Sequence, residues 1–165
     1  EWGIDEDIVA DGALAMSDSQ RAAFWRLREE QPEGQRRLGA QLKHDLSVPP
    51  SRLDEFLDRA NNECGEVLKG VTINAFGHLG DGNVHYNLSP PTGRRDFSGL
   101  GDEFSIKLGR LATEMGGSFA AEHGIGRTKV ELTDLLREPV ERNLMVSLKK
   151  ALDENNQLNP GVLVS

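Results

Sequence analysis

Two histidines, His78 and His85, stand on either side of Gly80-Asp81-Gly82-Asn83, a sequence typical of a β-hairpin turn. A two-residue turn centred on Asp81-Gly82 would place these histidines directly opposite each other, with Cβ atoms about 5 Å apart on one face of the sheet. Two imidazoles at that separation can share one divalent metal ion. Asn87 would project from the same face, because strand side chains alternate with a period of two. The same spacing also fits an ordinary pair of half-exposed cross-strand histidines.

A third candidate ligand lies in Glu122-His123, which precedes the flexible turn Gly124-Ile125-Gly126. Two histidines and a glutamate form a familiar open metal site that leaves room for a substrate. His123 could then act as a base beside the metal without binding it. The alternative is an ordinary loop entry in which Glu122 pairs with Arg127 or Lys129. The fourth histidine, His44, is expected at the surface or behind the site.

Two basic residues, Arg28 and Lys43, are candidates for binding a carboxylate. Arg28 is expected on a helix and Lys43 on a strand. An arginine could hold the anion through two parallel hydrogen bonds. Both residues could instead be solvated surface charges, which is the more common role of such side chains.

The composition narrows the classes of function. The 165 residues include 19 Lys and Arg against 27 Asp and Glu, a formal net charge of -8, which does not favour binding to nucleic acid. No apolar run reaches the roughly 18 residues that a membrane span needs, and no leader sequence opens the chain. The single cysteine, Cys64, excludes an internal disulfide and a cysteine-rich zinc site. We therefore expect an intracellular domain.

The glycine-rich loops do not form a nucleotide site. Gly124-x-Gly126 lacks the third glycine of a dinucleotide-binding fingerprint, because Lys129 stands in its place. No phosphate-binding loop of the Gly-x-x-x-x-Gly-Lys-Ser/Thr type occurs either. The chain therefore contains no self-contained nucleotide site.

The hydrophobic pattern predicts alternating strands and helices that position these residues. A capping box at residues 51–54 is expected to begin the first helix of this series, and Pro32 is expected to end or kink an earlier helix. The order is β-α-β-β-α-β with a helix before and after, which predicts an α+β fold of the ferredoxin-like split type, with helices on one face of an antiparallel sheet. The expected elements are a helix over 19–37, a strand over 41–48, a helix from 53, strands over 71–76 and 84–88, a helix over 98–115, a short strand over 118–121 and a helix over 139–152.

Four motifs together resemble the C-terminal domain of FAD-linked oxidases, in the vanillyl-alcohol-oxidase-like flavoprotein superfamily. That branch includes D-lactate, glycolate and D-2-hydroxyglutarate dehydrogenases, and the likeness runs from about Trp25 to Val164. The motifs are Leu42-Lys43-His44-Asp45-Leu46-Ser47-Val48-Pro49, Gly77-His78-Leu79-Gly80-Asp81-Gly82-Asn83-Val84-His85, Glu122-His123-Gly124-Ile125-Gly126 and Leu158-Asn159-Pro160-Gly161.

The resemblance implies a role for each candidate residue. One position departs from the pattern: the 2-hydroxyglutarate branch has a threonine one helical turn after the arginine, where this chain has Pro32, which puts that substrate in doubt. The implied roles are divalent-metal ligands, usually to zinc, for His78, His85 and Glu122; the general base for His123; contacts with the substrate for Asn87, Arg28 and Lys43; and a place near the flavin for Asn159.

The implied function is oxidation of a D-2-hydroxy acid to the 2-oxo acid, with metal assistance and hydride transfer to FAD. The family binds FAD mainly through a separate N-terminal domain, which has no counterpart here. We therefore expect residues 1–165 to be the C-terminal domain of a longer enzyme, inactive alone, with a poorly defined segment over 1–17. The absence of an initiator methionine supports that expectation.

Other arrangements stay open. The chain could be a free-standing metal-binding module, the partner subunit of a separate flavin domain, or a metal-dependent hydrolase. A homodimer is also compatible with the sequence. The expected location is the cytoplasm of a bacterium or the mitochondrial matrix of a eukaryote.

Overall fold

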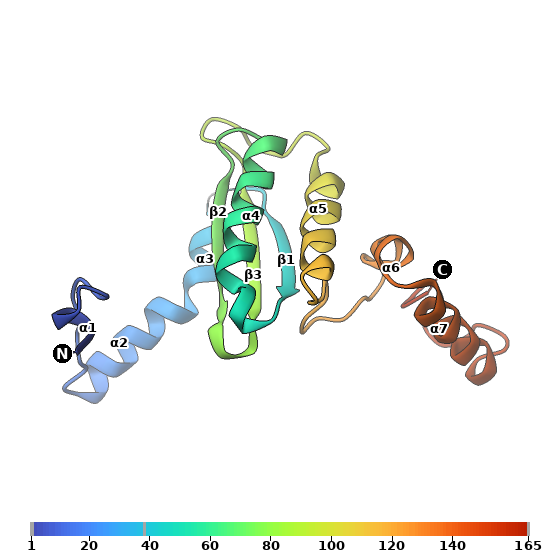
Figure 1. Ribbon diagram of the computed structural model, residues 1–165, viewed down its shortest axis with the longest axis horizontal. Helices are drawn as coiled ribbons and strands as arrows, with labels where there is room; N and C mark the ends of the chain where they lie inside the picture. The colour runs from blue at the N-terminus through green and yellow to red at the C-terminus, as the bar shows by residue number, and fades with distance from the viewer. Residues whose placement is uncertain (1, 38, 165) are drawn as a thin grey trace. The chain divides into compact units, whose positions relative to one another are not determined.

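The computed structural model describes residues 2–37 and 39–164, so the end positions of the 1–165 domain prediction lie outside the described residues. The chain divides into two compact units, Glu1–Leu38 and Gly39–Ser165. Figure 1 labels their helices and strands. The first unit holds α1 (Trp2–Asp5), α2 (Asp18–Glu29) and α3 (Gln31–Arg36), and the second holds β1 (Leu42–Ser47), α4 (Leu53–Val67), β2 (Thr72–His78), β3 (Asn83–Ser89), α5 (Gly101–Glu114), α6 (Val130–Leu136) and α7 (Pro139–Leu152).

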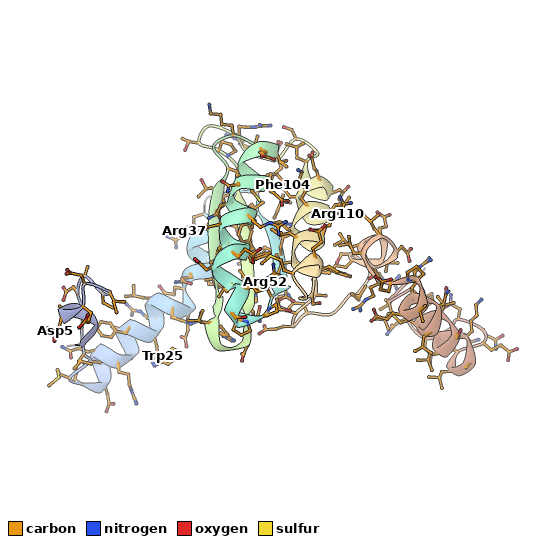
Figure 2. All side chains as sticks on the ribbon, in the orientation of Figure 1. Asp5, Trp25, Arg37, Arg52, Phe104 and Arg110 are labelled. Carbon is orange, nitrogen blue, oxygen red and sulfur yellow. The ribbon has the colours of Figure 1, made fainter. Side chains whose placement is uncertain are left out.

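In the first unit the predicted interruption near Pro32 is confirmed. Ser17 caps α2 by accepting a hydrogen bond from the backbone of Gln20, and the helix ends at Glu29. Pro32 lies at the start of α3. A backbone N–H at this position has no hydrogen-bond partner within the helix, so a proline, which has no N–H, is tolerated there. Among the described residues of α2 and α3 none is buried, and Trp25 projects outward from α2 (Figure 2).

The second unit is built on a three-stranded antiparallel sheet in the order β1-β3-β2, which confirms the α+β class. Helices α4 and α5 lie together over one face of this sheet (Figure 1). Between the helices and the sheet lies the core, whose fully buried side chains include Phe56, Leu46, Leu88, Leu108 and, labelled in Figure 2, Phe104. Burial of this apolar surface is the main force that holds the unit together.

The predicted strand over 118–121 is reduced to a single bridge. Ser118 pairs with Ser47 at the outer edge of β1, the edge where the expected fourth strand belongs. The Ser118 hydroxyl then donates to the carbonyl of Ala120 and accepts from its N–H. Local bonds of this kind compete with a strand ladder, so the strand does not extend.

The capping box predicted at residues 51–54 is wrong. Pro50–Arg52 form a short 3-10 turn, and α4 begins at Leu53 with no side-chain cap. Ser51 therefore lies inside the turn instead of at the cap position. The Arg52 guanidinium pairs with Glu55 at 2.9 Å, one turn into the helix.

The hairpin between β2 and β3 is longer than predicted. His78 pairs with Asn83 and His85 with Phe76, so the expectation that the two histidines lie directly opposite each other is wrong. Leu79–Asp81 form a 3-10 turn that Gly82 ends with a positive φ of 64°. A Cβ on Gly82 would lie 1.8 Å from the carbonyl oxygen of Val48, so only glycine fits there. The register moves by two residues, which leaves each side chain on its original face.

The inner side of α4 carries Cys64, which is 1% exposed. Burial raises the pKa of the Cys64 thiol to about 11. Beside it, the Tyr86 hydroxyl donates to Asn61 at 2.7 Å.

Within 2–37 and 39–164, no helix has both the length and the apolar character to cross a membrane.

Candidate functional site

The sheet face that points away from α4 and α5 carries several of the candidate site residues. Because side chains alternate along each strand, the pairing of the three strands places its residues in three cross-strand rows. Consecutive rows are about 7 Å apart, since each is two residues further along a strand. We call this surface the polar face; its rows are Lys43, Asn87 and Asn74; Asp45, His85 and Phe76; and Ser47, Asn83 and His78.

The three predicted metal ligands lie together at one end of the polar face. Glu122 Oε2 lies 3.8 Å from His85 Nε2, and Glu122 Oε1 lies 3.9 Å from His78 Nδ1. The Asn83 amide donates to Glu122 Oε1 and fixes this carboxylate between the two imidazoles. His78 also has Asp81 at 3.7 Å. The diagonal placement of the histidines, caused by the longer hairpin, still allows both to reach one carboxylate.

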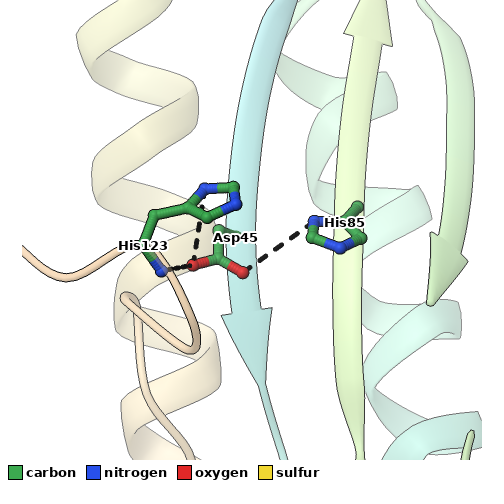
Figure 3. Close-up of side chains that lie close together, drawn as sticks. All are labelled: Asp45, His85 and His123. Atoms are coloured by element: carbon green, nitrogen blue, oxygen red, sulfur yellow. Dashed lines mark hydrogen bonds and ion pairs between the residues drawn. The ribbon is translucent and has the colours of Figure 1, made fainter. Parts of the chain in front are cut away.

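His123 lies beside this group and is largely exposed, at 66% of its side chain. Its Nδ1 is 3.7 Å from Asp45 Oδ2, and its ring lies 5.8 Å from the ring of His85 with an interplanar angle of 25°. Figure 3 shows His123 and His85 on opposite sides of Asp45. An exposed imidazole beside a carboxylate can accept a proton, because the carboxylate stabilises the imidazolium that forms.

Asp45 is a functional candidate that the residue types and spacing did not identify. Its carboxylate is buried, and Oδ2 accepts the backbone N–H groups of Glu122 at 2.8 Å and His123 at 2.9 Å. Its other oxygen, Oδ1, is buried without a hydrogen-bond partner and lies 3.9 Å from His85 Nδ1. Burial alone would raise the pKa of Asp45, but the two backbone donors, with His123 and Lys129 nearby, outweigh it and hold this pKa below its ordinary value. Strand alternation offered one signal, since Asp45 shares a face with Lys43.

Lys43 and Asn87, two of the predicted substrate contacts, are directly paired between β1 and β3. Lys43 is exposed and Asn87 is buried. Asn74 completes their row and donates to Ser89 at 3.4 Å. A cationic and an amide side chain thus lie one row from His85. Arg28, the third predicted contact, is in the last turn of α2, in the separate first unit.

The tail that carries Asn159 is tied to the loop that follows His123. The Arg127 guanidinium donates to the carbonyl of Pro160, and the backbone of Leu163 donates to Gly126 at 3.2 Å. Lys129 donates to the carbonyl of Phe119 at 3.1 Å. Arg127 and Lys129, the two residues considered as ion-pair partners of Glu122, therefore donate hydrogen bonds to backbone carbonyls instead.

His44 lies on the opposite face of the sheet, under α5, and is 8% exposed, so a surface position is wrong for it. Its Nδ1 is 3.0 Å from the carbonyl oxygen of Tyr86, and its Nε2 is 3.2 Å from the hydroxyl of Ser105. Burial lowers the pKa of His44 below 6.5, although the Tyr86 carbonyl acts in the opposite direction. Alternation explains the placement, because His44 falls between two residues of the polar face.

Comparison with known proteins finds one protein-family model and a set of relatives that share one name. A protein-family model described as FAD linked oxidases, C-terminal domain, matches residues 3–163. The chain is 35% identical over 165 residues to a D-2-hydroxyglutarate dehydrogenase of Xanthomonas citri pv. viticola, covering 99% of this chain and 35% of the relative. It is 33% identical over 165 residues to a probable mitochondrial D-2-hydroxyglutarate dehydrogenase of Oryza sativa subsp. japonica, covering 95% of this chain and 27% of the relative. For the mitochondrial D-2-hydroxyglutarate dehydrogenase of Rattus norvegicus, the identity is 32% over 160 residues, covering 97% of this chain and 29% of the relative. The chain thus spans between about a quarter and a third of the length of these curated relatives.

Proposed function

The chain belongs to the family of FAD-linked oxidase C-terminal domains, and from that premise we propose that residues 1–165 form the substrate- and metal-binding domain of an FAD-dependent dehydrogenase. The reaction oxidises a D-2-hydroxy acid to the 2-oxo acid. The observation that carries this proposal is the convergence of His78 and His85 on Glu122, with His123 next to them. FAD is held mainly by a separate domain, of the same chain or of a partner, and Asn159 lies near it.

The three ligand candidates fit a divalent metal, for which zinc is our first choice. Two imidazoles and one carboxylate are the donor set of many open zinc sites, and three protein ligands leave a position for substrate. The Glu122 carboxylate lies within 4 Å of both imidazoles through its two different oxygens, so the two histidines would move closer together to bind the same ion. When bound, the metal would act as a Lewis acid on the substrate hydroxyl and lower its pKa.

The remaining residues bind and orient the substrate and move its proton. Lys43 and Asn87 would bind a carboxylate one row away from His85, with Arg28 as a further cation. His123 would accept the hydroxyl proton at a ring nitrogen, and Asp45 would stabilise the resulting imidazolium. FAD would supply the acceptor for the hydride of C2, which would give the 2-oxo acid and reduced FAD.

D-2-hydroxyglutarate is the first substrate to test, because the relatives are named for it. The distance of about 7 Å between neighbouring rows suits a substrate with a second carboxylate beyond the reacting carbon. Pro32 offers no hydroxyl where that branch has threonine, so related D-2-hydroxy acids belong in the same panel.

The test is to express the complete gene product and to follow the visible absorbance of its flavin without oxygen. We expect D-2-hydroxyglutarate or another D-2-hydroxy acid to bleach the flavin, and the L-enantiomers to leave it oxidised. A protein that holds flavin but is bleached by none of the D-acids would contradict the proposal. A protein that hydrolyses a substrate without any flavin would instead support the hydrolase alternative.

The proposed setting follows the relatives. Several carry the word mitochondrial in their names, and others are bacterial. We therefore propose the mitochondrial matrix for a eukaryotic source and the cytoplasm for a bacterial one. We also propose that the protein forms a homodimer and that the reduced flavin passes its electrons to an acceptor.

A further inference from the structure

We propose that Asp45 is a positioning residue that orients His85 and Glu122 so that both can bind the metal. This inference rests on the proposed function, because it concerns the same metal site. The carboxylate of Asp45 lies between His85 on β3 and the loop that carries Glu122. Figure 3 shows this carboxylate between His85 and His123, the next residue of that loop.

One oxygen of Asp45 holds the loop. Oδ2 accepts the backbone N–H groups of both Glu122 and His123, at 2.8 and 2.9 Å. Hydrogen bonds to a charged acceptor are stronger than hydrogen bonds between neutral groups, and the Asp45 carboxylate is a buried acceptor of this kind. Since Ser118 ends the strand pairing early, these two bonds, with the Ala121 N–H that donates to the Asp45 backbone carbonyl at 3.3 Å, hold the backbone that brings Glu122 to the histidines.

The other oxygen faces His85. Oδ1 is buried, has no hydrogen-bond partner and lies 3.9 Å from His85 Nδ1. A carboxylate only accepts hydrogen bonds, so it favours the His85 tautomer with a proton on Nδ1. That tautomer leaves the lone pair on Nε2, the nitrogen 3.8 Å from Glu122. Carboxylates orient metal-binding histidines in this way in many proteins.

A second arrangement would make Asp45 a ligand itself, together with His85 and His123, since one atom from each lies within 4.8 Å of the others. The geometry favours the positioning role. Oδ2 is already occupied by two backbone donors, and Oδ1 has almost no contact with solvent. Only His123 is largely exposed in that set, whereas His78 and Glu122 are both about half exposed.

The test compares zinc binding by the 165-residue chain and its Asp45→Asn variant, by competition with a chromophoric chelator. Asparagine has the same shape and can still accept the backbone N–H groups with its oxygen. Its NH2 group then faces His85 and favours the tautomer with the proton on Nε2. We expect zinc affinity to fall by about 10- to 100-fold. Asp58→Asn, an exposed carboxylate on α4, is the matched control and should bind zinc like the parent chain.

The outcomes separate the two proposals. If the parent chain does not bind zinc, the metal site of the proposed function is wrong. If it binds zinc and Asp45→Asn binds equally well, the positioning role is wrong and the proposed function stands. If His123→Ala loses zinc and Glu122→Gln does not, Asp45 belongs to the alternative ligand set and the positioning role is also wrong.

A measurement on the unsubstituted chain tests the inference even if Asp45→Asn fails to fold. Nitrogen-15 NMR distinguishes the two tautomers of a neutral histidine. In metal-free protein at about pH 8, where an ordinary histidine is neutral, we expect the proton of His85 on Nδ1. A proton on Nε2 would overturn the inference.

Discussion

His123 is the residue on which the proposed proton transfer depends. In the complete enzyme, His123→Ala should slow reduction of the flavin by substrate by about 10²- to 10⁴-fold, the usual contribution of a general base. Zinc affinity and thermal stability should stay close to those of the parent, because the exposed ring is not one of the three proposed ligands. Single-turnover stopped-flow measurements check the rate. An unchanged rate would contradict the assignment of His123.

His44 makes the stability of the second unit depend on pH. Because burial lowers the pKa of His44 in the folded state, the unfolded chain takes up its proton first as the pH falls. The free energy of unfolding should therefore fall below about pH 6.5, by at most about 1.4 kcal/mol per pH unit from this group. Asp45, with its lowered pKa, contributes stability that is lost only below pH 3.8, in a separate window.

The variant His44→Asn should remove this dependence, since its amide can still donate to the Tyr86 carbonyl but does not titrate. Urea unfolding between pH 5 and pH 8 measures the difference in slope between parent and variant. Equal slopes would show that His44 has the same pKa in the folded and unfolded states, which would contradict this expectation. All other titrating groups are common to both proteins, so they cancel in the comparison.

Residue types and spacing pointed to His78, His85 and Glu122 as ligand candidates, which stay a prediction, but they did not point to Asp45. Histidines are scarce in this chain, so each could be weighed, whereas Asp45 is one of 27 acidic residues. Its special property is burial, which depends on the loop of Glu122 folding over it. A contact between residues 77 positions apart has no local signal in the sequence.

At the scale of elements, the hairpin that joins β2 and β3 depends on Gly82. Gly82→Ala should lower the free energy of unfolding by about 2 kcal/mol or more, because alanine is strained at positive φ and its Cβ would overlap the Val48 carbonyl. Gly80→Ala in the same loop has no atom within 4 Å of the added Cβ and should change stability by less than about 0.5 kcal/mol. Urea midpoints of the two variants make the comparison. Equal effects would mean that the turn can adopt another conformation.

Elements with strong boundary signals could be predicted, and those controlled by tertiary contacts could not. The last helix was expected over 139–152 and runs from Pro139 to Leu152, because a proline at its first position marks the start. The strand over 41–48 likewise matches β1, Leu42–Ser47. Ser118 could not be assigned correctly from pattern, because its own hydroxyl replaces the ladder bonds. The short helix α6 (Val130–Leu136) was also not predicted.

At the scale of the whole molecule, the fold of the second unit should not require the first. The cluster of buried core residues lies between Leu46 and Ile125, and α2 and α3 bury none of their described side chains. A chain of residues 39–165 should therefore unfold cooperatively, with a free energy within about 1 kcal/mol of the parent, and should bind zinc equally well. Circular dichroism in urea and chelator competition check both expectations. Loss of the cooperative transition would contradict this division.

The burial of Cys64 also makes the chain a convenient object for labelling chemistry. A thiol with a pKa of about 11 reacts slowly at neutral pH, because the thiolate is the nucleophile. A cysteine introduced at an exposed position would then be the only site that a maleimide dye modifies under native conditions. Slow modification of Cys64 itself would require α4 to open from the sheet. The rate of this modification would therefore measure how often the core opens locally.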